Sequence, residues 1–213
     1  MKRTLGLTLL LFATLFSCMR QEKPLPAELS RAESVMWEHP DSALSILRSM
    51  PQSSLSSGKN YATWALLLAQ ARDKVYGKRL PDSLNIPSSD ELVQDAMDYF
   101  EKEGNLKRMA QTYYYKGQLL KDQKKITEAM PFFLKSKEMM TKLDEPLFTY
   151  LICQSLGNTY RYQDLYEESL VQLKDAYQYA LRSGNGERIS YALSELGRTY
   201  VHKNEMEIGR AHV

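Results

Sequence analysis

The sequence predicts an all-α protein, built as a right-handed α-solenoid of antiparallel helix pairs. Gly117, Gly157 and Gly197 stand at even intervals along the chain, and a fixed period of this size is typical of stacked structural repeats. Apolar residues recur at helical spacing within the period, as between Phe132 and Met140. No stretch shows the strict alternation of polar and apolar residues that indicates a half-buried strand.

The residues that flank the three glycines repeat as well. Each glycine belongs to a large-x-x-Leu-Gly-x-x-Tyr pattern with small departures, in residues 113–120, 153–160 and 193–200. A small residue in each of two helices allows their backbones to approach closely. A second pattern, small-x-x-x-large-x-x-small, follows the first two glycines at the same offset, with Ala129, Phe133 and Ser136, and with Ser169, Leu173 and Ala176.

These two patterns together resemble the tetratricopeptide repeat (TPR) family. Its signature, W-x2-L-G-x2-Y followed by A-x3-F, forms a pair of antiparallel helices. The interval from one repeat glycine to the next exceeds the usual TPR period of about 34 residues, and we interpret the excess as longer helices or turns. The resemblance is clear from Ala110 to Asn204 and weaker over much of the remaining chain.

The resemblance also implies a surface for a partner, because the first helix of each TPR pair lines an inner, concave groove. Tyr114 is expected to point into this groove, with Tyr113 in the core and Tyr115 against the neighbouring repeat. The alternative is that the groove residues are merely solvated, since a solenoid presents such a face whether or not a ligand uses it. Polar and aromatic residues hold the implied groove positions, namely Gln111, Tyr114, Gln118, Lys121, Gln154, Asn158, Arg161, Tyr162, Tyr191, Ser194, Arg198 and His202.

The start of the chain is predicted to be a targeting segment and a tether. A basic start, an apolar run over 5–16 and a small residue before Cys18 indicate a secretory signal peptide in residues 1–17. Leu15-Phe-Ser-Cys18 resembles a bacterial lipobox, although Phe16 is bulkier than the usual residue. This resemblance implies that Cys18 is lipidated and that residues 18–26 tether the fold to a membrane. The alternative is an ordinary signal peptide with an incidental cysteine.

The solenoid itself is predicted to span residues 27–207. A helical stripe covers 27–38, and Pro40 ends it and suits the start of the next helix. Another helix is expected over 61–76, followed by a long loop that is an insertion relative to the regular repeats. Ser89 and the two acidic residues after it then favour a new helix start.

Residues 208–213 are expected to be an artefact at the end of a C-terminally truncated chain. They do not continue the repeat, which requires a second helix with a small residue near position 209. This segment matches one translated reading frame of a widely used sequencing adapter. The last helix, from about Glu187, is therefore expected to lack its partner helix and to expose its apolar face.

The sequence predicts no enzyme active site, no metal site and no cofactor. His39 and His202 lie far apart and lack cysteine or carboxylate neighbours at ligand spacing. Cys153 holds the first large position of its repeat and is expected to be a buried small hydrophobe. Without Lys2, Arg3 and Arg210 of the two terminal segments, the basic and acidic residues nearly balance. This balance carries no electrostatic signature of nucleic-acid binding.

These features predict a membrane-anchored TPR scaffold that binds a protein or peptide partner in the bacterial envelope. The lipid anchor at Cys18 would place it on the periplasmic side of the outer membrane of a Gram-negative bacterium. The alternative is the N-terminal sensor part of a longer regulator, in which the solenoid precedes a transmembrane helix and a helix-turn-helix domain. A role in outer-membrane assembly or polysaccharide uptake is suggested only by family analogy.

Overall fold

The computed structural model describes residues 24–76 and 89–211. The predicted signal peptide, Cys18, most of the tether, the long loop over 77–88 and residues 212–213 lie outside the described residues. The described parts contain α-helices and one 3₁₀-helix and no strand. In chain order they are α2 (Ala27–Val35), α3 (Pro40–Ser49), η1 (Gln52–Leu55), α4 (Gly58–Tyr76), α5 (Ser89–Glu103), α6 (Leu106–Asp122), α7 (Ile126–Leu143), α8 (Pro146–Arg161), α9 (Tyr166–Ser183) and α10 (Gly186–Ala211).

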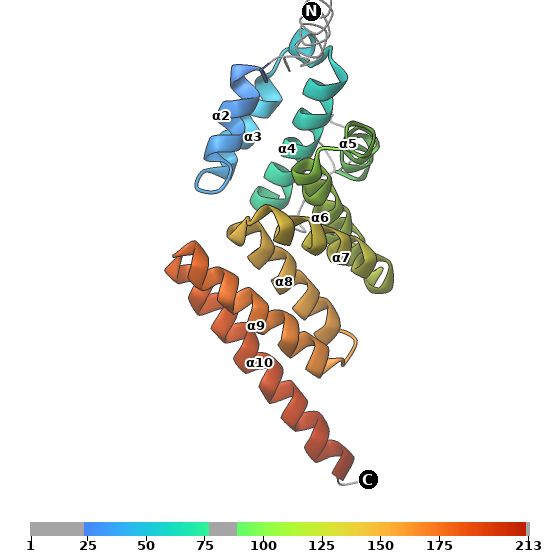
Figure 1. Ribbon diagram of the computed structural model, residues 1–213, viewed down its shortest axis with the longest axis vertical. Helices are drawn as coiled ribbons and strands as arrows, with labels where there is room; N and C mark the ends of the chain where they lie inside the picture. The colour runs from blue at the N-terminus through green and yellow to red at the C-terminus, as the bar shows by residue number, and fades with distance from the viewer. Residues whose placement is uncertain (1–23, 77–88, 212–213) are drawn as a thin grey trace, which may run out of the picture.

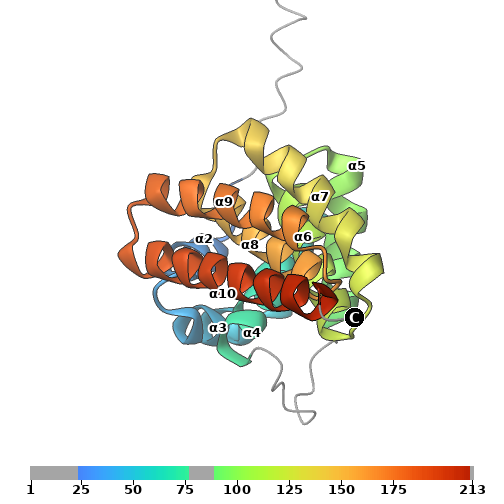
Figure 2. The same cartoon turned by 90° about the horizontal axis from the view of Figure 1, so that it is seen from below.

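The helices stack as successive antiparallel pairs, which confirms the predicted right-handed α-solenoid (Figure 1). Helices α6 and α7 form one regular pair, and α8 and α9 form the next. The first helices of successive pairs, α2, α4, α6 and α8, also contact one another. They therefore form the inner layer of the array, and α10 lies at its edge beside α9 (Figure 2).

A residue with left-handed backbone conformation recurs at even intervals through the regular repeats. These residues have φ angles from 54° to 77° and sit where one helix ends and the chain reverses. At two of these turns the backbone N–H of the following residue bonds back into the helix, from Lys125 to Leu120 and from Leu165 to Tyr160. This bond ends the helix in the manner of a Schellman motif. The left-handed residues are Gly104, Lys124, Asp144, Asp164 and Gly184.

The repeat glycines allow the second helix of each pair to pack closely on the first. A Cβ atom added to Gly117 would lie 2.7 Å from Cε1 of Phe133, and one added to Gly157 would lie 2.5 Å from Cγ of Leu173. Both large residues are fully buried. The large residue of the predicted small-and-large pattern is therefore a knob that fills the space over each glycine.

The first helix pair has the boundaries that the prolines predict. Pro40 occupies the first turn of α3, where its missing N–H leaves no helical hydrogen bond unmade. Pro131, by contrast, lies beyond the first turn of its helix. Helix α7 begins earlier, at Ile126, and Pro131 lies inside it. Lys125 precedes this helix and its carbonyl accepts from the N–H of Ala129, so the first turn is already complete before the proline.

Helix α10 is longer than the repeat predicts. Asn204 stands at the next position for a left-handed turn after Gly184, yet α10 continues to Ala211. Residues 208–211, which belong to the segment predicted to be an artefact, therefore continue the helix. None of the helices in the described ranges combines the length and the apolar character that crossing a membrane requires.

Candidate partner-binding face

On α6 the predicted groove residues form a chain of hydrogen bonds. Lys121 donates to the side-chain oxygen of Gln118, which donates from Nε2 to the Tyr114 hydroxyl at 2.9 Å. Gln118 and Lys121 are partly exposed. Gln111 is buried and accepts a hydrogen bond from Arg108. This part of the face is therefore held in place by its own side chains.

The three consecutive tyrosines are all buried, and Tyr114 differs from the expectation that it points into an open groove. Its ring packs at 5.2 Å from the ring of Phe148 on α8, centroid to centroid, and burial raises the pKa of its hydroxyl. Tyr115 also packs against Phe148, on the neighbouring repeat as predicted. Tyr113 lies in the core and donates to Glu101, and burial together with this bond raises the pKa of Tyr113 to about 12.

On α8 the predicted groove residue Arg161 is already paired. Its guanidinium donates to Glu195 of α10 at 2.7 Å, to Asn158 at 3.0 Å and to Thr199 at 3.2 Å. Glu195 is only 1% exposed, and the Arg161 side chain is 11% exposed. The second carboxylate oxygen of Glu195 lies 2.9 Å from Nη1 of Arg198, but no well-aligned hydrogen bond reaches it. Arg161 therefore joins two repeats and is not open to a ligand carboxylate.

The remaining groove positions are open to solvent. Tyr162 is 68% exposed and Tyr191 is 47% exposed. Ser194, Arg198 and His202 are also exposed along α10. The structure therefore divides the predicted groove residues into a packed group on α6 and α8 and an exposed group that lies mostly on α10.

A depression between the starts of α8 and α10 brings together two predicted groove residues, Gln154 and Tyr191. It has a volume of about 260 Å³ and a mixed lining. Burial raises the pKa of the lining residue Tyr150 to about 12, and the nearby Tyr191 adds to this rise. We call this feature the α8–α10 depression, and its lining is Tyr150, Leu151, Gln154, Glu187, Arg188 and Tyr191.

Sequence reasoning missed Trp37, which connects the first helix pair to α8 and α10. Its ring meets Phe148 of α8 edge-on, with the centroids 6.2 Å apart. Nζ of Lys74 lies 3.7 Å from the ring centroid, and Cζ of Arg188 lies 5.8 Å from it. Burial lowers the pKa of Lys74 to about 8, with Asp73 opposing this change and Arg188 adding to it. The only indication in the sequence was that a tryptophan stands just before Pro40, where the first helix was expected to end.

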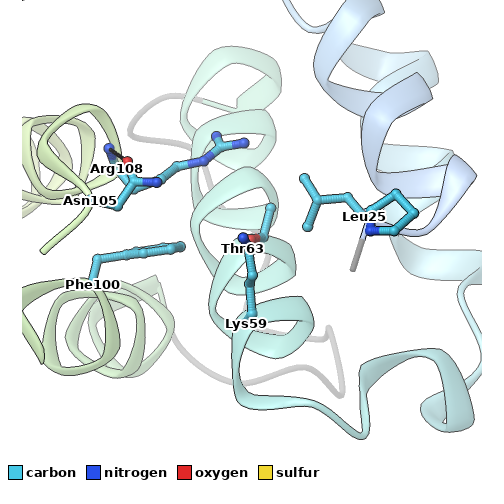
Figure 3. Close-up of a pocket in the computed structure, with 7 residues that line it drawn as sticks. Leu25, Lys59, Thr63, Phe100, Asn105 and Arg108 are labelled. Carbon is cyan, nitrogen blue, oxygen red and sulfur yellow. Dashed lines mark hydrogen bonds between the residues drawn. The ribbon is translucent and has the colours of Figure 1, made fainter. Parts of the chain in front are cut away.

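A second pocket of about 260 Å³ lies between the start of the described chain and α4, α5 and α6. Figure 3 shows Leu25 on one side, Phe100 and Arg108 on the other, and Thr63 of α4 between them. The guanidinium of Arg108 is paired with Glu33 at 2.7 Å. Nζ of the remaining cation, Lys59, lies 3.7 Å from a carboxylate oxygen of Glu103. The cations of this pocket are thus engaged by neighbouring carboxylates.

Cys153 is buried as predicted, in a core cluster with residues of α9. Burial raises the pKa of its thiol to about 12, although Lys137 nearby lowers it in part. Over the described ranges, His, Cys, Asp and Glu side chains form no group of three or more that could hold a metal ion.

Comparisons with known proteins found similarity of structure. No protein-family model and no curated protein matches this chain. A STAND signal transduction ATPase with a tetratricopeptide repeat sensor, from Pyrococcus horikoshii, matches in structure with a TM-score of 0.62 and 17% identity. BtubC (BKLC) from P. vanneervenii matches with a TM-score of 0.57 and 17% identity.

The two similarities differ in extent. The first covers 83% of this chain and 26% of the ATPase, so this chain spans about a quarter of that protein. The second covers 88% of this chain and 71% of BtubC. At this level of identity the comparisons establish a TPR-like helical fold and nothing finer.

Proposed function

We propose that this chain is a protein-interaction scaffold that holds a protein or peptide segment at the α8–α10 depression. One observation carries the proposal: Gln154 and Tyr191, which hold groove positions in successive repeats, line the same depression. Tyr191 offers a large, partly exposed ring with a polar tip, which is typical of residues at binding surfaces. The proposal assigns no catalytic role to the chain.

The lining of the depression supports a short peptide segment as the ligand. A space of about 260 Å³ holds one or two side chains of a partner. Gln154 can donate to or accept from a peptide backbone. Glu187 and Arg188 place both signs of charge at its edge, so a partner segment with one apolar side chain and mixed polar neighbours fits best.

A photocrosslinking experiment tests this site. A photoreactive phenylalanine analogue is placed at Tyr191 and, as a matched control, at Val171, which is 56% exposed on α9. We expect a partner adduct at position 191 and none at 171. The purified partner should then bind the unmodified chain and lose at least tenfold in affinity for a variant with Tyr191→Ala and Gln154→Ala. Equal crosslinking at both positions would contradict the proposal.

We also propose that the chain is a lipoprotein of the bacterial envelope, anchored through Cys18. The support is the sequence Leu15-Phe-Ser-Cys18 after a short apolar run. Metabolic labelling with an alkyne fatty acid should mark the wild-type chain in a Gram-negative host. Cys18→Ser should abolish the label, and the control Cys153→Ser should retain it. A label that survives Cys18→Ser would exclude the anchor.

The second candidate is a sensor within a longer signalling protein. It is favoured by the first structural match, whose TPR region is described as a sensor. The sequence of the intact gene beyond the codon for Glu207 separates the two candidates. A reading frame that continues into about 20 apolar residues and a basic helical domain would favour the sensor.

A further inference from the structure

Two cations from distant helices meet at the ring of Trp37. Nζ of Lys74, in the last turn of α4, lies 3.7 Å from the centroid of the ring, and Cζ of Arg188, in the first turn of α10, lies 5.8 Å from it. Both distances fall within the range of about 6 Å over which a cation–π contact acts. Over the residues that the structure describes, neither side chain forms an ion pair with a carboxylate.

The lack of a carboxylate partner distinguishes these two cations from the arginines of the inner helices α6 and α8. Arg108 of α6 donates to Glu33 at 2.7 Å, and Arg161 of α8 donates to Glu195 at 2.7 Å. The fold thus neutralises the positive charge of each of these arginines. At the ring of Trp37 it places two positive charges together instead.

The acidic residues that stand next to the two cations in the sequence do not pair with them. Asp73 and Glu187 directly precede Lys74 and Arg188, and successive residues of a helix point about 100° apart. Burial lowers the pKa of Lys74 to about 8, while Asp73 opposes this change and Arg188 adds to it. An anion between the two cations would therefore favour their charged forms.

The two cations adjoin the α8–α10 depression, because Arg188 belongs to both. Its guanidinium lies near the ring of Trp37, and the same residue lines the depression together with Gln154 and Tyr191. Its charge also acts on Tyr150 of this lining, since it partly offsets the rise in the pKa of that tyrosine. A peptide segment in the depression therefore reaches the two cations with an adjacent residue.

We propose that Lys74 and Arg188 form a carboxylate site, which binds an acidic group of the peptide segment held in the α8–α10 depression. This inference rests on the function proposed above and adds the anionic group that the partner carries. An ammonium and a guanidinium both donate charge-assisted hydrogen bonds to a carboxylate, and a guanidinium can bind both of its oxygens. The ordinary anionic groups of a protein or peptide are the side chains of Asp and Glu and the C-terminus.

The surroundings of the site favour binding. Trp37, Lys74 and Arg188 are all partly buried, and opposite charges attract each other more strongly in partly desolvated surroundings than in open water. The contacts with the ring already restrict both long side chains, so less conformational freedom is lost when a ligand binds. A bound carboxylate would also connect α4 with α10.

The indole N–H signals in ¹H–¹⁵N NMR spectra test the site without the partner. The chain has two tryptophans, and Trp64 is an internal reference because its indole N–H donates to the carbonyl of Leu47 at 2.9 Å. The probe is N-acetylglutamate α-amide at pH 7, below the pKa of Lys74. We expect the Trp37 signal to shift saturably, with a dissociation constant in the millimolar range, and the Trp64 signal to stay in place. The uncharged N-acetylglutamine amide should shift neither signal.

Lys74→Met and Arg188→Met should each weaken binding of the acid at least tenfold, because methionine keeps an apolar stem and removes the charge. Lys135→Met is the matched control, since Nζ of this lysine lies 5.3 Å from the centroid of the Tyr113 ring, at another part of the molecule. It should leave the affinity within twofold of the wild type. A Trp37 signal that does not shift, or that shifts equally in all four proteins, would overturn the carboxylate site and leave the proposed function intact.

The partner segment crosslinked at position 191 provides the second test. A synthetic peptide of this segment should bind at least tenfold more weakly to Lys74→Met and to Arg188→Met than to the wild type. Replacement of its Asp and Glu residues by Asn and Gln, compared with amidation of its C-terminus, identifies the carboxylate that binds. Equal affinity for the three proteins would overturn this proposal alone. The absence of any adduct at position 191 would contradict the proposed function as well, and a bound acid would then indicate a site for a free small carboxylate only.

Discussion

At the scale of single residues, the ion pair between Arg161 and Glu195 is the main polar link between α8 and α10. Both side chains are nearly inaccessible to water. A buried pair adds little net stability over apolar residues of the same shape, but the loss of one partner leaves an uncompensated charge. The pair therefore matters most for the position of α10 relative to α8.

Glu195→Ala should lower the free energy of unfolding by about 3 to 5 kcal/mol, because it leaves the Arg161 guanidinium buried without its carboxylate. Urea denaturation followed by circular dichroism measures the change. Glu205→Ala is the control, since this carboxylate is exposed and lies beside the half-exposed His202. It should change stability by less than about 0.5 kcal/mol. Equal effects of the two substitutions would show that the Arg161–Glu195 pair does not hold α10.

Lys74 should make stability depend on alkaline pH. Its pKa is about 8 in the fold and 10.5 for an unperturbed lysine side chain, so the unfolded chain binds more protons between these values. Stability contributed by this residue therefore rises as the pH increases from the lower value to the higher one. The difference in stability between wild type and Lys74→Met, from urea curves at each pH, isolates this effect from tyrosine titration. A difference that stays constant over this range would contradict the assignment.

At the scale of helices, the three repeat glycines occupy one sequence position but different packing situations. Gly117 and Gly157 lie under a buried side chain, whereas Gly197 has open space above it. The repeat pattern in the sequence does not distinguish the three positions. The same substitution should therefore destabilise the fold at Gly117 and Gly157 and stabilise it at Gly197.

Gly157→Ala and Gly117→Ala should each destabilise the fold by about 1 to 3 kcal/mol, because the new methyl group overlaps Leu173 or Phe133. Gly197→Ala should instead stabilise it by about 0.5 to 1 kcal/mol, since alanine is the better helix former and meets no neighbour. Thermal unfolding of the three variants provides the comparison. A loss of stability with Gly197→Ala would mean that another group already covers the open side of this glycine.

At the scale of the whole molecule, Trp37 connects the two ends of the solenoid. Most contacts in the array join neighbouring helices, as expected of a repeat protein. Trp37 is an exception, because it follows the first helix of the first pair and reaches Phe148 of α8 and Arg188 of α10. We therefore expect the curvature of the inner face to depend on this contact.

Trp37→Ala should open the solenoid and increase its radius of gyration, measured by small-angle X-ray scattering. The substitution should also lower the free energy of unfolding by about 3 kcal/mol, because the aromatic and cation–π contacts of Trp37 are lost. Trp64→Ala is a suitable control. Its indole N–H donates to the carbonyl of Leu47 on the adjacent helix, a local contact. Trp64→Ala should lower the free energy of unfolding and leave the radius of gyration unchanged. Equal radii in all three proteins would contradict a long-range role for Trp37.

The sequence by itself determined the class of fold and the unit from which it is built. The even spacing of the repeat glycines and the small-and-large pairs recur along the chain, and in α6 and α8 each corresponds to a local contact between adjacent helices. Such contacts depend on residues a few turns apart, so they leave a periodic signal. The burial of Cys153 and the start of α10 near Glu187 followed from the same signal.

The tertiary structure alone decided which groove residues are open. Tyr114 and Arg161 hold groove positions in the repeat, yet the structure buries the first against α8 and pairs the second with α10. Trp37 gave almost no signal, because its contacts with Phe148 and Arg188 join residues that are far apart in the sequence. Periodicity reports the contacts that every repeat makes. The curvature of the stack creates contacts that occur once, and these determine which side chains are available to a partner.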